Sequence, residues 1–168
     1  KEGIVFEPKF MKIKILLEIC LNGDAAGLKR LVEGSTLTKL TGVGGGRAHL
    51  DSGDARGKTS LMYAAALGHR AVVEILLSRK DEVDANKADD TQKCALHHAA
   101  KRGLQRRPGE APSVQEEIVN MLLMAEANVE ARDHNGCTAL MFAVANGEEF
   151  VTKRLIAHQA NVNIKDFE

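Results

Sequence analysis

The stretch that decides the fold is Asp54-Ala55-Arg56-Gly57-Lys58-Thr59-Ser60-Leu61, which Ala64-Ala65 and Gly68-His69 follow. The 168-residue chain repeats this arrangement with variations. Four copies fall into register when the glycine after each run of small apolar residues is aligned, at Gly23, Gly68, Gly103 and Gly147. A leucine stands seven residues before each of these glycines, at Leu16, Leu61, Leu96 and Leu140. The chain is therefore built from repeated units.

Each unit carries two apolar runs at helical spacing. Before the glycine, residues such as Leu61, Ala64 and Ala65 form one narrow apolar face, and a second run follows it, as at residues 72–77. We therefore predict two short helices in every unit. Three units begin with an aspartate, at Asp54, Asp89 and Asp133, where we predict the turn that links one unit to the next.

Residues 54–69 resemble the ankyrin repeat, whose pattern D-x-x-G-x-T-P-L-H-x-A-A-x-x-G-H precedes V-V-x-x-L-L. Residues 133–147 repeat it, and the resemblance covers roughly residues 13–166. It implies an all-α solenoid of stacked helix-turn-helix units linked by hairpin-like finger loops. The residues support this independently, because small alanines allow neighbouring helices to approach closely and a single unit could not bury its own apolar face.

The spacing of the glycines is irregular. Their separations are 45, 35 and 44 residues, so two units carry insertions of about 12 and 11 residues relative to the family period of about 33. The predicted segments are an N-terminal extension (1–11), a capping repeat (12–34), a Gly-rich insertion (35–53), repeat 2 (54–86), repeat 3 (87–131) with an insertion at 104–113, repeat 4 (132–164), and 165–168 as a tail or the start of a further repeat. Ser113 to Glu116 form a predicted capping box after the second insertion.

The third unit departs most from the pattern. We expect Thr59 and Thr138 to cap the first helix of their units, and the glycine at each helix end to adopt a left-handed conformation. In the third unit, Cys94 replaces the capping threonine and Gln92 replaces the turn glycine, where a positive φ brings more strain. We expect this unit to be the least stable locally.

Composition narrows the class of function. Hydrophobic residues make up 44% and charged residues 27%, as in ordinary globular proteins. Basic and acidic residues both number 23 and aromatic residues are only 4%, so we expect neither nucleic acid nor a membrane as a partner. The three cysteines are few, odd in number and far apart, which favours a reducing compartment, the cytosol or the nucleus. We expect a monomer.

Signs of catalysis, cofactor or metal binding are weak. Gly57-Lys58-Thr59 resembles the end of a phosphate-binding loop, but Ser52 stands where that motif requires glycine. His97 and His98 are adjacent, so on a helix they point about 100° apart and cannot hold one metal from the same turn. His97 matches the structural histidine of the repeat family. We therefore predict a non-catalytic protein without cofactor or metal.

The resemblance implies that partner-binding side chains lie on the finger turns and the exposed face of the first helices, forming one concave groove. The matching positions are Arg56, Lys58, Leu67, Asp90, Thr91, Lys93, Lys101, Arg102, His134, Asn135 and Asn146. Five of them are basic although the chain is neutral overall. These basic residues are about as well explained by the charged surface of any soluble protein as by a binding site. Our hypothesis is that the groove binds an acidic or phosphorylated segment of a partner protein.

Two further interpretations follow from the resemblance. The alternative function is a regulatory or targeting ankyrin segment of a larger enzyme, such as a ligase, kinase or transferase, whose catalytic domain lies outside this chain. Asn163 occupies the finger position that an asparaginyl hydroxylase can modify in this family, with Leu155 eight residues upstream. A turn-stabilising asparagine is the simpler interpretation.

Overall fold

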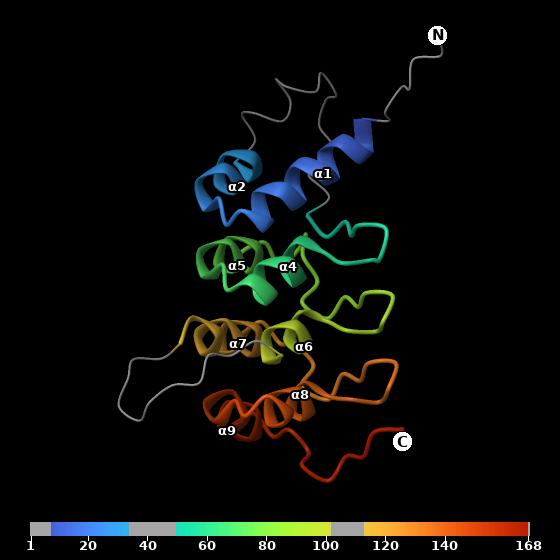
Figure 1. Ribbon diagram of the computed structural model, residues 1–168. Coiled ribbons are helices and arrows are strands. Elements are labelled where there is room, and N and C mark those ends of the chain that lie inside the picture. The colour runs from blue at the N-terminus through green and yellow to red at the C-terminus, as the bar shows by residue number, and fades with distance from the viewer. Residues whose placement is uncertain (1–7, 34–49, 102–112, 168) are drawn as a thin grey trace.

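The computed structural model describes residues 8–33, 50–101 and 113–167 of the chain. Within these ranges, eight α-helices stack as four pairs (Figure 1). The pairs are α1 (Pro8–Leu21) with α2 (Ala25–Val32), α4 (Ser60–Leu67) with α5 (Arg70–Leu77), α6 (Ala95–Ala100) with α7 (Val114–Met124), and α8 (Ala139–Ala145) with α9 (Glu149–Ala157). No β-strand occurs in the described ranges. The predicted all-α solenoid is confirmed.

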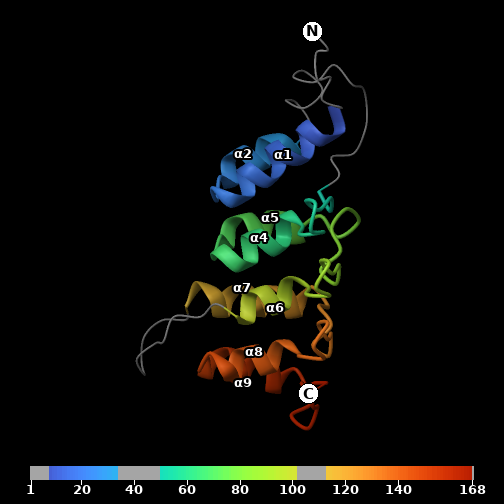
Figure 2. The same cartoon turned by 45° about the vertical axis from the view of Figure 1, so that its right-hand side comes forward.

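The helices form two parallel columns. The first helices α1, α4, α6 and α8 pack on one another in order, and the second helices α2, α5, α7 and α9 do the same. The loops at 54–58, 89–93 and 133–137, which we call fingers, project from one side of the stack next to the first helices (Figures 1 and 2). Finger residues and first helices therefore share one face of the molecule.

Alanine at the contact between first helices allows the repeats to stack closely. Ala64 and Ala65 of α4, and Ala99 and Ala100 of α6, have no exposed surface. Larger side chains, including Leu61, Leu76, Leu96, Ile118, Leu122 and Leu155, fill the space between the two columns and are fully buried as well. This core runs through all four pairs, as expected for a solenoid in which each unit buries the face of its neighbour.

Backbone hydrogen bonds join each finger to the next. The amide of Asp90 donates to the carbonyl of Arg56 at 3.0 Å, and the amide of His134 donates to the carbonyl of Thr91 at 3.1 Å. Residues near the end of the chain continue this series, because the amide of Phe167 donates to the carbonyl of Asn135 at 3.0 Å. Phe167 therefore lies in a finger position relative to repeat 4.

Helix ends agree with the sequence in part. The Thr59 hydroxyl accepts the amide N–H of Met62 at 3.3 Å and caps α4. Gly68 and Gly147 have φ of 80° and 71°, the left-handed conformation that was predicted for them. Thr138 is the N-cap residue of α8 but makes no capping hydrogen bond through its side chain. The prediction of a hydroxyl cap was therefore correct for Thr59 and wrong for Thr138.

Most of both predicted insertions lies outside the described residues. The exceptions are Ser113, at the end of the second insertion, and residues 50–53, at the end of the first, which pack onto the second repeat. Leu50 is 1% exposed, Gly53 forms an antiparallel bridge with Thr59, and the Lys87 ammonium donates to the carbonyl of Asp51 at 2.6 Å. These residues belong to the packed stack rather than to a loose insertion.

The second insertion ends where the sequence indicated. The Ser113 hydroxyl accepts the amide N–H of Glu116 at 3.2 Å, which is the serine half of the predicted capping box. The buried Gln115 side chain follows it and donates to the carbonyls of Ala65 at 2.7 Å and Ala99 at 3.1 Å. The start of α7 is therefore tied to the ends of two first helices.

Gln92 adopts the strained conformation expected from the missing glycine, with φ of 60° against 73° for Gly57 and 78° for Gly136. A left-handed conformation costs an ordinary residue about 1–2 kcal/mol. Glycine avoids this cost, but its greater freedom in the unfolded chain lowers the free energy of unfolding by about 0.4–1 kcal/mol. We predict that Gln92→Gly raises the free energy of unfolding by about 0.5–1 kcal/mol and Tm by about 1–4 °C in calorimetry. The reverse change, Gly57→Gln, should lower Tm, and a lower Tm for Gln92→Gly would contradict the explanation.

Candidate functional site

The aspartate that begins each finger closes it from inside. The Oδ1 atom of Asp89 accepts the amide N–H groups of Thr91 at 2.8 Å and Lys93 at 3.1 Å. Asp54 and Asp133 accept the corresponding amides, two and four residues further on, in their own fingers. Because the backbone of each finger is held in this way, the direction in which each finger side chain leaves the backbone is fixed.

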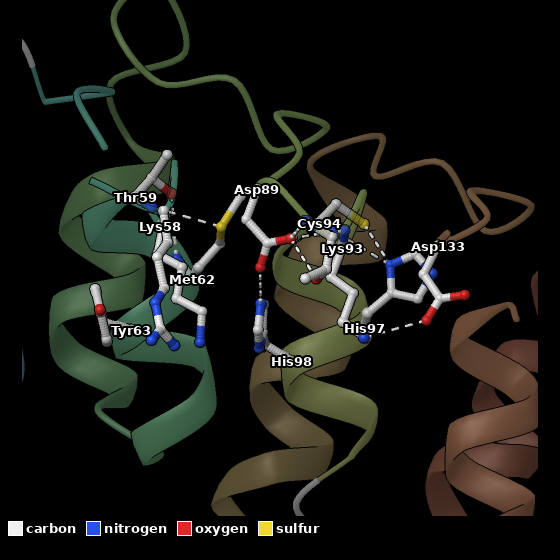
Figure 3. A network of polar contacts seen from close by, with 12 residues as sticks. Lys58, Thr59, Met62, Tyr63, Asp89, Lys93, Cys94, His97, His98 and Asp133 are labelled. Carbon is white, nitrogen blue, oxygen red and sulfur yellow. Dashed lines mark hydrogen bonds and ion pairs between the residues drawn. The ribbon is translucent and has the colours of Figure 1, made fainter. Parts of the chain in front are cut away.

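The second carboxylate oxygen has a different partner in each repeat. Nine residues after Asp54, the Tyr63 hydroxyl donates to Asp54 Oδ2 at 2.6 Å. At the corresponding position, His98 Nε2 donates to Asp89 Oδ2 at 2.9 Å (Figure 3). In repeat 4 this position is Phe142, which cannot donate. The ammonium of Lys93, from the preceding finger, lies 3.2 Å from Asp133 Oδ2 instead.

The Asp89 carboxylate is ionised and His98 is neutral. Burial alone would raise the pKa of Asp89, but hydrogen bonds from Thr91, His98 and the Lys93 amide outweigh it and lower the pKa to about 2. Burial lowers the pKa of His98, and the nearby charges of Lys58 and Lys93 lower it further against the hydrogen bond to Asp89. The negative charge is therefore enclosed within the finger.

His97 is a structural link between repeats 3 and 4. It is 1% exposed, and its Nδ1 accepts the amide N–H of Cys94 at 3.2 Å. The remaining proton is therefore assigned to Nε2, which lies 3.2 Å from the carbonyl oxygen of Cys137 and donates to it. Burial also lowers the pKa of His97. A ring with both nitrogens engaged in this way agrees with its interpretation as a structural histidine.

A hollow of about 480 Å³ opens between these fingers and the first helices. It is lined by Arg56, Lys58, Asp89, Asp90, Thr91, Lys93, His97, His98, Lys101 and Phe142. The structure thus brings together six of the eleven groove residues named from the sequence: Arg56, Lys58, Asp90, Thr91, Lys93 and Lys101. We call this hollow and its lining the basic hollow, because four of its side chains are basic and two are acidic.

Four other predicted groove residues lie outside the basic hollow. Leu67 is 37% exposed, and His134, Asn135 and Asn146 are exposed too, but none of these four lines the basic hollow. The Asn146 side chain donates to the carbonyl of Phe142 at 2.6 Å. Arg102 lies outside the described residues.

Sequence reasoning did not place Asp89, His97, His98 or Phe142 in the groove, although all four line the basic hollow. The sequence does contain a pattern that could have identified His98 and Phe142. Like Tyr63, each stands nine residues after the aspartate of its finger.

Asn163 is exposed, and its own amide N–H donates to Asn161 Oδ1 at 2.9 Å. The Asn161 side chain therefore helps to close this turn, and the turn-stabilising role of Asn163 stays an interpretation. Hydroxylation of Asn163 stays a prediction that the intact mass of the native protein would check.

Charge is the chemistry that this site offers. The ammonium of Lys58 lies 5.8 Å from the ring centre of Tyr63, and that of Lys93 lies 5.5 Å from the ring centre of Phe142. Among the described residues, no group of three or more His, Cys, Asp or Glu is arranged to hold a metal ion. No helix in the same part of the chain has the length and apolar character needed to cross a membrane.

Comparison with known proteins agrees with this architecture: residues 15–133 and 110–167 match the family model for ankyrin repeats. The chain belongs to the ankyrin-repeat family. Its ankyrin repeats are 32% identical to Inversin of Homo sapiens, over 88% of this chain and 15% of Inversin. They are 33% identical to zinc finger CCCH domain-containing protein 66 of Arabidopsis thaliana, over 79% of this chain and 21% of the relative.

A third relative is protein glp-1 of Caenorhabditis elegans, with 30% identity over 90% of this chain and 11% of the relative. The chain thus spans between a tenth and about a fifth of the length of these relatives. Ankyrin repeats are general protein-interaction modules whose stacked units form extended concave binding surfaces.

The Asp89 network predicts how acid acts on the ankyrin stack. The folded pKa of about 2 lies below the ordinary value of 3.8, so the stabilisation from ionised Asp89 is complete above about pH 4 and is lost as the pH falls towards 2. We predict that Asp89→Asn lowers the free energy of unfolding at pH 7 by about 1–3 kcal/mol. Urea unfolding at pH 7 and pH 3 should then show a smaller acid-induced loss than in the unmodified protein. The exposed neighbour change Asp90→Asn is the control, and an equal acid loss in Asp89→Asn would contradict this role.

Proposed function

We propose that this ankyrin stack binds a segment of a partner protein that is acidic or phosphorylated, in the groove formed by the fingers and the first helices. The observation that carries the proposal is the basic hollow, in which four basic side chains stand beside two acidic ones on a chain with no net charge. Lysine and arginine form charge-assisted hydrogen bonds with carboxylates and phosphates, which are about twice as strong as neutral ones.

The enclosed position of Asp89 supports this proposal. Asp89 is 3% exposed, and its carboxylate oxygens already accept hydrogen bonds from the finger and from His98. The carboxylate is therefore a poor partner for the lysines of the hollow. In the described part of the chain, no ion pair involves Arg56, Lys58 or Lys101. These three side chains, together with the ammonium donors of Lys93 that its ion pair with Asp133 leaves over, are the candidates for contact with a partner's anionic groups.

The composition of the hollow favours a peptide segment over a small molecule. Small-molecule pockets are lined predominantly by hydrophobic and aromatic side chains. Here Phe142 is the single apolar residue of the lining, and the other nine residues have charged or polar side chains. Contacts of this kind are individually weak in water, so a partner must make several of them along the stack.

We also place this module in the cytosol or nucleus as part of the proposal, because its three cysteines are free thiols.

Charge reversal tests the proposal. We predict that Lys58→Glu with Lys101→Glu weakens binding of a fluorescein-labelled peptide rich in glutamate and phosphoserine by at least about tenfold, because two attractive contacts become repulsive. The measurement is fluorescence anisotropy at low and physiological salt, with circular dichroism to check the fold. Lys29→Glu with Lys153→Glu, on the second helices α2 and α9, makes the same change of charge and should affect binding much less. Equal effects of the two double variants would contradict a specific groove.

A further inference from the structure

Three rings occupy the same position in consecutive repeats. Tyr63 on α4, His98 on α6 and Phe142 on α8 each stand nine residues after the aspartate that begins their finger. Tyr63 is the single tyrosine of a chain in which aromatic residues are 4%. All three are half-buried, so each keeps part of its surface open to solvent. We call these three residues the ring column.

The rings of the column are held in place from inside the protein. The Tyr63 hydroxyl and His98 Nε2 are hydrogen-bonded to the carboxylates of their finger aspartates. The ring of Phe142 packs edge-on against the ring of His97, with centres 6.0 Å apart and an angle of 82° between the planes. A ligand that packs against these rings therefore meets surfaces that need little reorganisation.

Lysines recur with the same period as the rings. Lys58 and Lys93 each stand four residues after the finger aspartate, and both line the basic hollow. Figure 3 shows the His98 imidazole between the two lysine side chains. The charges of both lysines lower the pKa of His98. The ion pair of Lys93 with Asp133 leaves ammonium protons free, because an ammonium carries three donors. Each of the two repeats thus presents one ring and one cation.

The spacing of stacked helices selects the conformation of a bound segment. Packed helices lie about 8–10 Å apart. A polyproline II helix rises about 3.1 Å per residue with three residues per turn, so every third side chain returns to the same face after about 9 Å. A β-strand covers a similar distance in three residues, but its side chains alternate between faces, so residues i and i+3 would point in opposite directions.

We propose that the segment bound by this stack is a polyproline II helix with acidic side chains three residues apart. One carboxylate contacts Lys58, the carboxylate three residues away contacts Lys93, and proline or small apolar residues between them pack on the ring column. Aromatic-lined grooves recognise polyproline II segments because such segments are already extended before binding. This inference rests on the proposed function and adds to it the conformation and the register of the partner segment.

Peptides of identical composition test the register. Three fluorescein-labelled twelve-residue peptides carry two glutamates among prolines and alanines. The second glutamate stands two, three or four positions after the first. Fluorescence anisotropy should show the three-residue spacing binding about tenfold more tightly than the other two, because in these only one carboxylate can reach a lysine at a time. Replacing the prolines by glycines at the three-residue spacing should weaken binding, because the free peptide then loses its extended preference.

A pair of matched variants locates the effect. Lys58→Gln should abolish the preference for three-residue spacing. With Lys93 alone, only one of the two carboxylates has a lysine to contact, so the distance between them no longer affects binding. Lys29→Gln on α2 removes the same charge from a different part of the stack and should leave the preference unchanged. Lys29 is exposed and forms an ion pair within its own helix, with Glu33.

The possible results separate this inference from the proposed function. Equal affinity for all three spacings, or a preference for two residues as in a β-strand, would overturn the polyproline II register and leave an acidic groove in place. No measurable binding of any of these peptides or of the phosphoserine peptide would overturn the proposed function together with the register. A three-residue preference that Lys58→Gln removes and Lys29→Gln keeps would support both.

Discussion

Close packing of the first helices is the constraint on which the rest of this protein depends. Alanine at 64, 65, 99 and 100 brings α4 and α6 together with no exposed surface between them. A larger side chain at any of these positions would push neighbouring repeats apart, because protein interiors have few voids to absorb extra volume. The distance from one repeat to the next follows from this contact, and so does the spacing of every side chain that recurs once per repeat.

The finger aspartates give the fingers of successive repeats the same backbone conformation. Each one holds its finger with one carboxylate oxygen and uses the other to bind a group that differs from repeat to repeat: Tyr63, His98 or Lys93. Asp89 and Asp133 are thereby buried with their charges engaged inside the protein, while Arg56 and Lys101 are exposed. A chain of zero net charge can in this way present a hollow with four basic and two acidic side chains, of which only Asp90 is an exposed acid.

Local pattern explains which sequence predictions were confirmed and which were wrong. The positive φ of Gln92 could be predicted because it depends on the neighbouring residues of one turn, as do the left-handed glycines Gly68 and Gly147. The hydroxyl cap was correct at Thr59 and wrong at Thr138, although both stand at the same N-cap position. A side-chain rotamer is chosen by its surroundings in space, which the repeat pattern does not specify.

Period and spacing in the sequence by themselves determined the number of helix pairs, their order, the turns between them and six of the residues that line the basic hollow. These features depend on separations of a few residues, which recur in each unit and can be counted. The tertiary structure alone decided that Lys93 reaches Asp133 of the next repeat, that His97 bonds to the carbonyl of Cys137, and that His98 stands between two lysines. Two of these contacts join residues 40 positions apart in the chain. They arise because stacking places equivalent positions of neighbouring repeats side by side, where small differences in side-chain length and chemistry choose the partner.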